Sequence, residues 1–195
     1  MSHGLLGEAK FYALLVRFDV ELCASARLGG CWSCGGRLDR ADFPRKPRGG
    51  PSDLDAAYGK RLGLCCDVCR VRTLPQSVRF MGRRVYLAAI VVLVSAMRHG
   101  ATPSRVAELD ALFGISTRTL VRWRRWWTET FPTTPFWKAA RGRFSGDVDL
   151  VQMPKSLIER FGADEDADAM TRVLQFLSPI TTASRVPRAR IPMGL

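Results

Sequence analysis

Two Cys-x-x-Cys pairs, Cys31–Cys34 and Cys66–Cys69, constrain the fold of this chain more than any other feature of its sequence. Each short turn can present two thiolates to one ion, and the glycines that follow Cys34 let the backbone curl around the sulfurs. Four thiolates complete a tetrahedral shell and leave no position for a reactive water, so the spacing predicts a structural zinc ion. Such an ion stabilises a small, loop-rich module that could not bury enough apolar surface by itself.

The second pair leaves one alternative open, because Cys65 could replace Cys66 by pairing with Cys69 across three residues. We favour Cys66, since its spacing repeats that of the first pair and Cys65 then faces the other side of an extended chain. A disulfide framework is disfavoured in a reducing compartment, and a thioredoxin-like pair would explain only one of the two motifs. We do not expect His3 or His99 to be ligands.

The charge of the chain indicates a polyanionic partner. Thirty Lys and Arg residues stand against 18 Asp and Glu residues, which gives a net charge of +12. Arginine supplies most of the positive charge, and its guanidinium matches phosphate geometry better than the lysine ammonium does. Segment 81–131 carries eight basic and three acidic residues and is the most basic part for its length. Nucleic acid is therefore the expected partner.

A membrane location is not expected. Residues 85–97 form the most apolar run of the chain, but this many helical residues span about 20 Å, against about 30 Å for the hydrocarbon core of a bilayer. The run therefore predicts a buried helix. The beginning of the chain lacks a basic start followed by an apolar run, so we expect no secretory signal and a cytoplasmic location.

The N-terminal part is predicted to be a helix followed by a ribbon. Residues 9–28 repeat apolar side chains at three- and four-residue spacing, which is typical of an amphipathic helix, and Cys23 on it is expected to be a packing residue. The inward stripe is expected to be Phe11, Leu14, Leu15, Phe18 and Leu22. Residues 35–58 are rich in Gly and Pro and predict a loop or ribbon tip, and short extended pieces are expected at 61–64 and 70–74. The tip exposes Arg45, Lys46 and Arg48, which we expect to grip phosphate or the minor groove.

The central part predicts a helix-turn-helix. Helices are expected at 81–98, 103–113 and 117–130, and the last two are joined by a tight turn at Gly114. Leu120 and Trp123 anchor the last helix on its inner side, and this helix would enter the major groove. Its outer side chains are Thr117, Arg118, Val121, Arg122 and Arg125. The DNA contacts predicted here are Ser116, which also caps the helix, Thr117, Arg118, Arg122, Arg124 and Arg125, with Arg124 placed to touch backbone phosphates.

Two details qualify this interpretation. The position four residues before the turn glycine is usually small, but here it is Asp110, so either the helices cross differently or Asp110 pairs with a neighbouring arginine. Trp123, Trp126 and Trp127 are expected in the core and in interfaces rather than against bases. We expect no exposed aromatic platform of the kind that binds single-stranded nucleic acid.

The C-terminal part predicts short helices and no active site. Helices are expected near 155–161 and at 166–177, followed by a poorly ordered basic tail. The acids of this part, Asp147, Asp149, Glu159 and those within 164–168, have no strand framework around them, so we expect them to be solvated rather than catalytic. The fold class is thus mainly α with a small β zinc ribbon. Its expected parts are 1–80, an N-terminal helix and zinc ribbon; 81–131, a trihelical helix-turn-helix; and 132–195, a helical extension with a flexible basic tail.

The cysteine segments "CWSCGGRLDRADFPRKPRG" and "CRVRTLPQSVRFMGRRVYL", followed by "FGISTRTLVRWRR", resemble the DNA-binding region of transposases and accessory proteins of bacterial insertion sequences. The resemblance covers about residues 25–135. It implies a protein of the bacterial cytoplasm, associated with the nucleoid. It also implies that zinc is bound by Cys31, Cys34, Cys66 and Cys69, and that DNA is met by Thr117, Arg118 and Arg122.

These observations together predict a non-catalytic, sequence-specific protein that binds double-stranded DNA for a mobile element. The region after residue 131 is too short for a strand-transfer domain, so a transposase or recombinase partner would cut. Two alternatives remain: a transcriptional regulator with the same binding chemistry, and an adaptor that docks a recombinase or ribonucleoprotein and contacts nucleic acid without choosing sequence. Because one helix-turn-helix reads few base pairs, a homodimer or a companion protein would complete the site.

Overall fold

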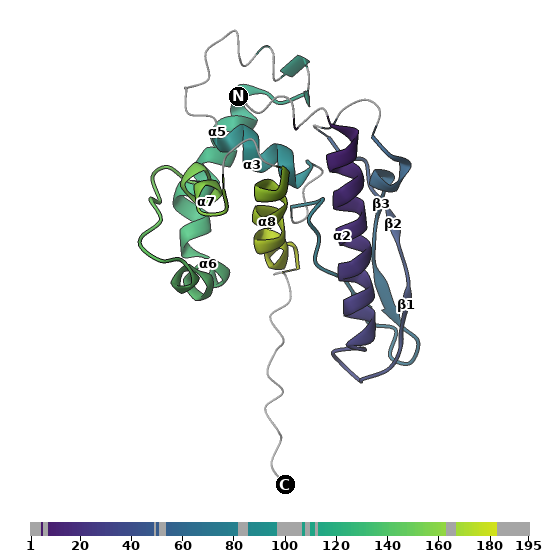
Figure 1. Cartoon of the computed structure of the whole chain (residues 1–195). Helices are drawn as coiled ribbons and strands as arrows, with labels where there is room; N and C mark the ends of the chain where they lie inside the picture. The colour runs from purple at the N-terminus through teal and green to yellow at the C-terminus, as the bar shows by residue number, and fades with distance from the viewer. Residues whose placement is uncertain are drawn as a thin grey trace.

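The structure is a computed structural model, and it describes residues 5, 8–48, 50, 54–81, 86–96, 107, 110, 111, 113–162 and 167–182. Helix α2 lies beside the strands on one side of the molecule, and the shorter helices gather on the other side (Figure 1). The helices are α2 (Ala9–Leu28), α3 (Ala88–Ala96), α5 (Thr117–Arg125), α6 (Pro135–Ala140), α7 (Lys155–Glu159) and α8 (Ala167–Leu177). A mainly helical chain with a small antiparallel sheet is therefore confirmed.

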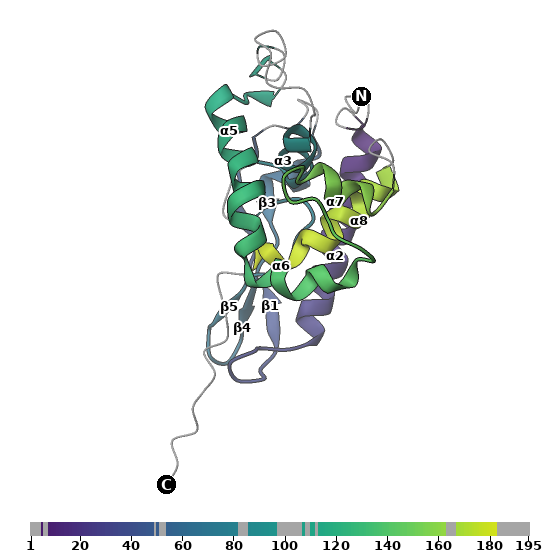
Figure 2. The same cartoon turned by 90° about the vertical axis from the view of Figure 1, so that its left-hand side faces the viewer.

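The ribbon contains two small antiparallel sheets. Strands β1 (Leu38–Arg40), β4 (Leu64–Cys66) and β5 (Arg72–Thr73) form one sheet in the order β1-β4-β5. Strands β2 (Phe43–Pro44) and β3 (Lys60–Arg61) form the other. The three-stranded sheet lies at one end of the molecule (Figure 2).

The range 35–58, predicted as a loop or ribbon tip, also contains two short strands. Strands β1 and β2 form within this range, because Leu38 is fully buried opposite Cys66, and Pro44 pairs with Lys60 in a sheet of only two strands. In such a sheet every strand is an edge, where the missing N–H of a proline is tolerated. A 3-10 turn (Ala56–Gly59) precedes β3, and the hydroxyl of its Tyr58 donates to the carbonyl of Tyr12, 2.9 Å away.

Helix α2 buries a stripe that is rotated slightly from the predicted one. Phe11 and Leu15 are buried as expected, but Leu14, Phe18 and Leu22 are only half-buried and flank the stripe. The buried positions continue at Tyr12, Asp19 and Cys23. The polar Asp19 was left out of the predicted stripe because an apolar pattern does not include a buried carboxylate.

Asp19 is the centre of a buried polar network that joins α2 to the ribbon. The Arg79 guanidinium donates to its carboxylate at 2.7 Å, and Arg61 lies 4.0 Å from the same oxygen. The Ser77 hydroxyl and the Val78 N–H also donate to it, at 2.7 and 2.8 Å. Asp19, Arg61 and Arg79 are each at most 2% exposed.

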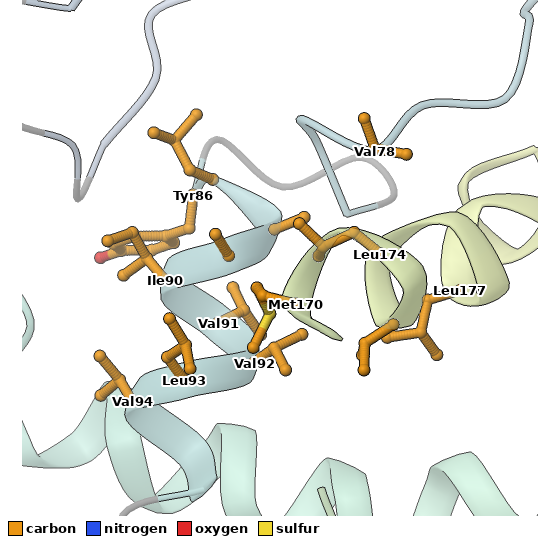
Figure 3. Close-up of a cluster of buried hydrophobic side chains, with 14 of the residues drawn as sticks. Val78, Tyr86, Ile90, Val91, Val92, Leu93, Val94, Met170, Leu174 and Leu177 are labelled. Atoms are coloured by element: carbon orange, nitrogen blue, oxygen red, sulfur yellow. The ribbon is translucent and has the colours of Figure 1, made fainter. Parts of the chain in front are cut away.

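Helix α3 is buried along its whole length from Ala88 to Ser95. It contacts α5, α7 and α8, and Figure 3 shows its Val91 and Val92 side chains lying next to Met170 of α8. The predicted buried helix in this apolar run is therefore confirmed. No helix among the described residues is long and apolar enough to span a membrane.

The start of this helix differs from the predicted residue 81. Tyr86 and Leu87 are extended, since Tyr86 forms a parallel bridge with Arg48 and Leu87 an antiparallel bridge with Phe80. Hydrogen bonds from Leu87 N–H to the Arg48 carbonyl and from Ala88 N–H to the Arg79 carbonyl hold this pairing. Backbone pairing thus replaces the helical conformation at Tyr86 and Leu87.

The described residues contain part of the predicted helix-turn-helix. Ala107, Asp110, Ala111 and Phe113 are helical, whereas the other residues of 103–113 lie outside the described residues, as do His3 and His99. Gly114 has a φ of +62°, and its N–H donates to the Asp110 carbonyl, so the turn lies where it was predicted. The crossing of the two helices is not described, so the helix-turn-helix arrangement stays a prediction.

Helix α5 continues as a π-helix (Trp126–Thr130) and a 3-10 turn (Phe131–Thr133), close to the predicted end at 130. Beyond it, α7 and α8 match the two predicted helices, while α6 was not predicted. An aromatic cluster joins these elements, with ring centroids 5.0 Å apart for Trp127 and Phe131 and 5.2 Å apart for Phe136 and Phe176. Further 3-10 turns are formed by Arg141–Arg143 and Ser178–Thr181.

Buried hydrophobic residues form two clusters of unequal size. The larger contains residues from all three predicted parts of the chain, including Leu15, Val92, Trp123 and Leu174. The smaller lies in the ribbon and consists of Cys23, Cys31, Leu38, Leu62, Leu64 and Cys66. The division into parts 1–80, 81–131 and 132–195 stays a prediction about the sequence.

Candidate metal centre

Four thiols gather at the end of the ribbon, where they could hold one metal ion. The sulfurs of Cys31, Cys34, Cys66 and Cys69 all lie within 4.8 Å of one another. The Cys31 and Cys69 sulfurs are 3.5 Å apart, and the Cys34 and Cys66 sulfurs are 3.4 Å apart. A tetrahedral ion with metal–sulfur bonds of about 2.3 Å places its sulfurs about 3.8 Å apart, so this group has the size of a four-thiolate site.

The chain presents these sulfurs on two turns of similar backbone geometry. In the first turn the Gly35 N–H donates to the Cys31 carbonyl at 2.7 Å, and the Cys31 N–H donates to the Gly36 carbonyl at 2.9 Å. In the second, the Cys66 N–H donates to the Val71 carbonyl at 3.0 Å. The residue directly after the second cysteine is left-handed in both turns, with φ +76° at Gly35 and +59° at Arg70. Glycine adopts this conformation without strain, whereas an arginine adopts it only at a cost.

The surroundings of Cys31 favour its thiolate form. The Ser33 N–H lies 3.4 Å from the Cys31 sulfur, and this hydrogen bond lowers the pKa of Cys31 to about 7. The thiolate is the form that binds a metal. On the surface of the site, Arg37 pairs with Asp67 at 3.6 Å, and the Asp67 N–H donates to the Arg37 carbonyl, which ties the two turns together.

Cys65 and Cys23 lie outside this group of sulfurs. Cys65 lies in β4, the middle strand of the sheet, where it pairs with Asp39 of β1 and Arg72 of β5. Its thiol lies 3.5 Å from the Arg70 carbonyl. Of the two alternatives left open by the sequence, the structure therefore brings Cys66 to the site. Cys23 is buried in the ribbon cluster, as a packing residue.

The predicted DNA-contacting face of α5 is exposed. Thr117, Arg118, Val121, Arg122 and Arg125 all lie in solvent, opposite the buried Leu120 and Trp123. Arg124 is half-buried.

Two of these predicted contacts have partners that the prediction did not include. The Arg125 guanidinium pairs with Glu129 at 2.7 Å, which compensates part of its charge; the spacing of four residues could have identified this pair. Ser116 is exposed at the position before the helix, but its hydroxyl lies 3.2 Å from that of Thr119 and makes no side-chain cap.

The predicted basic residues of the ribbon differ in exposure. Lys46 and Arg48 are exposed, whereas Arg45 is half-buried with its guanidinium 5.4 Å from the centre of the Phe43 ring. The backbone of Arg48 pairs with Tyr86. The Tyr86 ring in turn contacts Trp123 edge-on, with the centroids 4.9 Å apart. One residue thus connects the basic ribbon segment with α5.

The aromatic and acidic side chains lie mostly as expected. Trp123 and Trp127 are buried and Trp126 is half-buried against Phe131, so these three tryptophans are core residues. Asp147, Asp149, Glu159 and Asp168 are exposed, and residues 163–166 lie outside the described part of the chain. Trp32 is the exception, because 59% of it is exposed at the metal site, where no exposed aromatic group was expected. Its position between the two cysteines of a predicted metal-binding turn was the signal that could have identified it.

Comparison of the chain with family models, with curated proteins and with solved structures found no match.

Proposed function

We propose that this chain is a sequence-specific DNA-binding protein that carries a structural zinc ion and serves a mobile element without catalysing strand transfer. The observation that carries the proposal is the outer face of α5. There Arg118 and Arg122 extend into solvent from a helix whose opposite face is fixed in the core by Leu120 and Trp123. A helix held in this way can enter a major groove without losing its own packing.

Zinc is the ion that this site supports best. Four thiolates with tetrahedral spacing are typical of structural zinc, and a closed shell of this kind stabilises the protein rather than taking part in a reaction. Cys31, Cys34, Cys66 and Cys69 would hold the ion. Its role is to fix the two turns that end the ribbon, where the apolar cluster is small.

The basic side chains support two kinds of DNA contact. The nine residues of α5 extend over about 13 Å, and an arginine on this helix can make a bidentate contact to guanine in the major groove. Lys46 and Arg48 lie on an irregular segment and suit phosphate contacts, which position a protein without reading sequence. Tyr86 connects this segment with the buried side of α5, and the proposal is that both contacts form on one duplex.

The mobile-element setting is supported by the resemblance of the cysteine turns and of "FGISTRTLVRWRR" to insertion-sequence proteins. The absence of catalysis is supported by the exposed positions of Asp147, Asp149 and Glu159, which do not converge with other acids among the described residues. A transcriptional regulator would use the same face of α5 and would differ only in the sites that it binds.

The test is a selection of sheared genomic DNA by the zinc-loaded protein at near-physiological salt, followed by affinity measurements on the enriched site. Enrichment of repeated element ends supports the proposal, and enrichment of promoters assigns the chain to regulation. Arg122→Ala is expected to cost about 1–3 kcal/mol and to relax base preference. Lys46→Ala is expected to weaken binding to all sequences equally. It should also lower the slope of the logarithm of the binding constant against the logarithm of salt concentration by about one unit.

A further inference from the structure

Exposed apolar side chains gather at the metal-binding end of the ribbon. Among the described residues, Leu28 is 90% exposed, Trp32 59% and Val68 71%. Leu28 ends α2 just before the first turn, Trp32 lies inside that turn, and Val68 lies inside the second. Large apolar groups in solvent around one feature indicate a binding surface rather than chance exposure.

Two of these apolar side chains and one arginine are carried by the two cysteine turns. Trp32 directly follows Cys31, while Val68 and Arg70 are the neighbours of Cys69, and the Cys31 and Cys69 sulfurs are 3.5 Å apart. An aromatic face, an apolar side chain and a cation therefore lie at the same end of the ribbon. The Arg70 side chain is exposed, and no ion pair with it is seen in the described part of the chain.

The backbone that carries Trp32 is held on both sides. Cys31 and Cys34 belong to the thiol group, and the turn between them is closed by the Gly35 to Cys31 hydrogen bond of 2.7 Å. The backbone at Trp32 therefore needs no ordering when a ligand binds, and the entropic cost falls on the rotamers of the side chain alone. The position of Trp32, rather than its ring, is preorganised.

The charge of this end complements a polyanion. Residues 27–39 and 65–72 contain four arginines and two aspartates, and one of the arginines, Arg37, bridges to both Asp39 and Asp67. Base–aromatic stacking needs an open ring face, and a nearby cation can reach the phosphate of the same nucleotide. A protein partner would make use of the apolar groups but would leave the arginine excess unexplained.

We infer that the metal-binding end of the ribbon binds an unpaired nucleobase, which stacks on Trp32 while Arg70 contacts the adjoining phosphate. The ligand class is single-stranded nucleic acid. This inference rests on the proposed nucleic-acid function and extends it from reading a duplex to holding a strand that is open. Because the site has few cations, its affinity depends on salt less steeply than duplex binding does.

The experiment measures binding of the full-length, zinc-loaded protein to a labelled single strand of DNA, to RNA of the same sequence, and to the matching DNA duplex. Trp32→Leu keeps an apolar side chain but removes the ring, and Trp32→Phe keeps a ring. We expect Trp32→Leu to weaken the binding of both single strands by roughly 5- to 100-fold, which corresponds to about 1–3 kcal/mol. Duplex binding should be unchanged. Trp32→Phe is expected to retain most of the affinity.

A second measurement does not depend on the fold of the leucine variant. Stacking on Trp32 quenches its fluorescence, so the single strand should quench the parent and not Trp32→Phe, although both bind. Single-strand binding that is equal for the parent and Trp32→Leu overturns the inference, and so does equal loss on strand and duplex. If the parent binds the single strand through Trp32 but does not bind the duplex, only the proposed duplex function is wrong. Duplex selection without strand binding removes this inference alone and points to a protein partner for Trp32.

Discussion

Asp19 lies in the middle of a helix whose other buried residues are mostly apolar or aromatic, and its carboxylate accepts hydrogen bonds from Ser77, Val78 and Arg79. A buried carboxylate remains charged at moderate cost only when it is paired and fully hydrogen-bonded. Here the same group also faces Arg61, so one acid compensates two buried guanidiniums. These contacts connect α2, β3 and the chain that leads into α3.

We expect Asp19→Asn to lower the free energy of unfolding by about 3 kcal/mol or more, because two buried cations then lose their counter-charge. The control is Asp39→Asn, whose carboxylate is 45% exposed and pairs with Arg37 at 3.4 Å. Pairs of that kind contribute about 0–1 kcal/mol. Urea denaturation of the zinc-loaded variants measures both. Similar small losses for the two variants would show that the buried network contributes no more than a surface pair.

Spacing along the chain explains which site residues the sequence could identify. Cys31 and Cys34 belong to one short turn, so their pattern is visible directly in the sequence. The hydrogen-bond partners of Asp19 lie 58 to 60 residues further along the chain, and no local pattern connects them. Trp32 was missed for a related reason, since exposure depends on what the rest of the fold leaves uncovered.

At the scale of the elements, α3 is the helix around which α5, α7 and α8 are arranged. Its side chains from Ala88 to Ser95 are buried, and α5, α7 and α8 all contact it. The helix has no polar face among these residues, so its stability depends on being covered by its neighbours. Helix α8 therefore contributes to the same core as the central part of the chain, although it lies about 80 residues further along the sequence.

We expect Leu174→Ala on α8 to destabilise the protein by about 2–5 kcal/mol, because Leu174 is 1% exposed within the large hydrophobic cluster. Leu28→Ala is the matched control, since Leu28 is 90% exposed and the change should stay within about 0.5 kcal/mol. Thermal or urea unfolding compares them. A near-neutral Leu174→Ala would mean that α8 is not part of the cooperative core.

The local sequence pattern identified α2, α3, α7 and α8, with an apolar repeat in α2 and a continuous apolar run in α3. It failed at the start of α3, where Tyr86 and Leu87 pair with Arg48 and Phe80 instead of being helical. It also missed β1 and β2, since two- and three-residue strands are too short to show an alternating pattern. Long-range pairing decided the structure in both places.

At the scale of the whole molecule, two buried clusters differ in what stabilises them. The large cluster contains side chains from nearly every helix, whereas the ribbon cluster contains six buried residues, two of which, Cys31 and Cys66, belong to the group of thiols that could hold a metal ion. An ion that binds only the folded state stabilises it according to its concentration and affinity. The ribbon should therefore depend on the metal more than the helices do.

Removal of zinc with a chelator is expected to lower the free energy of unfolding by about 4 kcal/mol, relative to protein held at roughly 1,000 times the zinc dissociation constant. Hydrogen exchange should show loss of protection in β1, β4 and β5 while α3 remains protected. Re-addition of zinc should restore the ribbon. Equal loss in the ribbon and in α3 would indicate one cooperative unit, and no loss anywhere would argue against a structural ion.

The buried network around Asp19 also limits how a sequence with this fold can diverge. An apolar residue at position 19 leaves the guanidiniums of Arg61 and Arg79 buried without a counter-ion, so a lineage that loses the acid must replace the two arginines as well. Arg118 and Arg122 on the exposed face of α5 carry no such structural constraint, so only their proposed role in DNA binding can keep them. Distant relatives of this chain should therefore either keep Asp19, Arg61 and Arg79 or replace all three together, and this joint pattern can be used to recognise them.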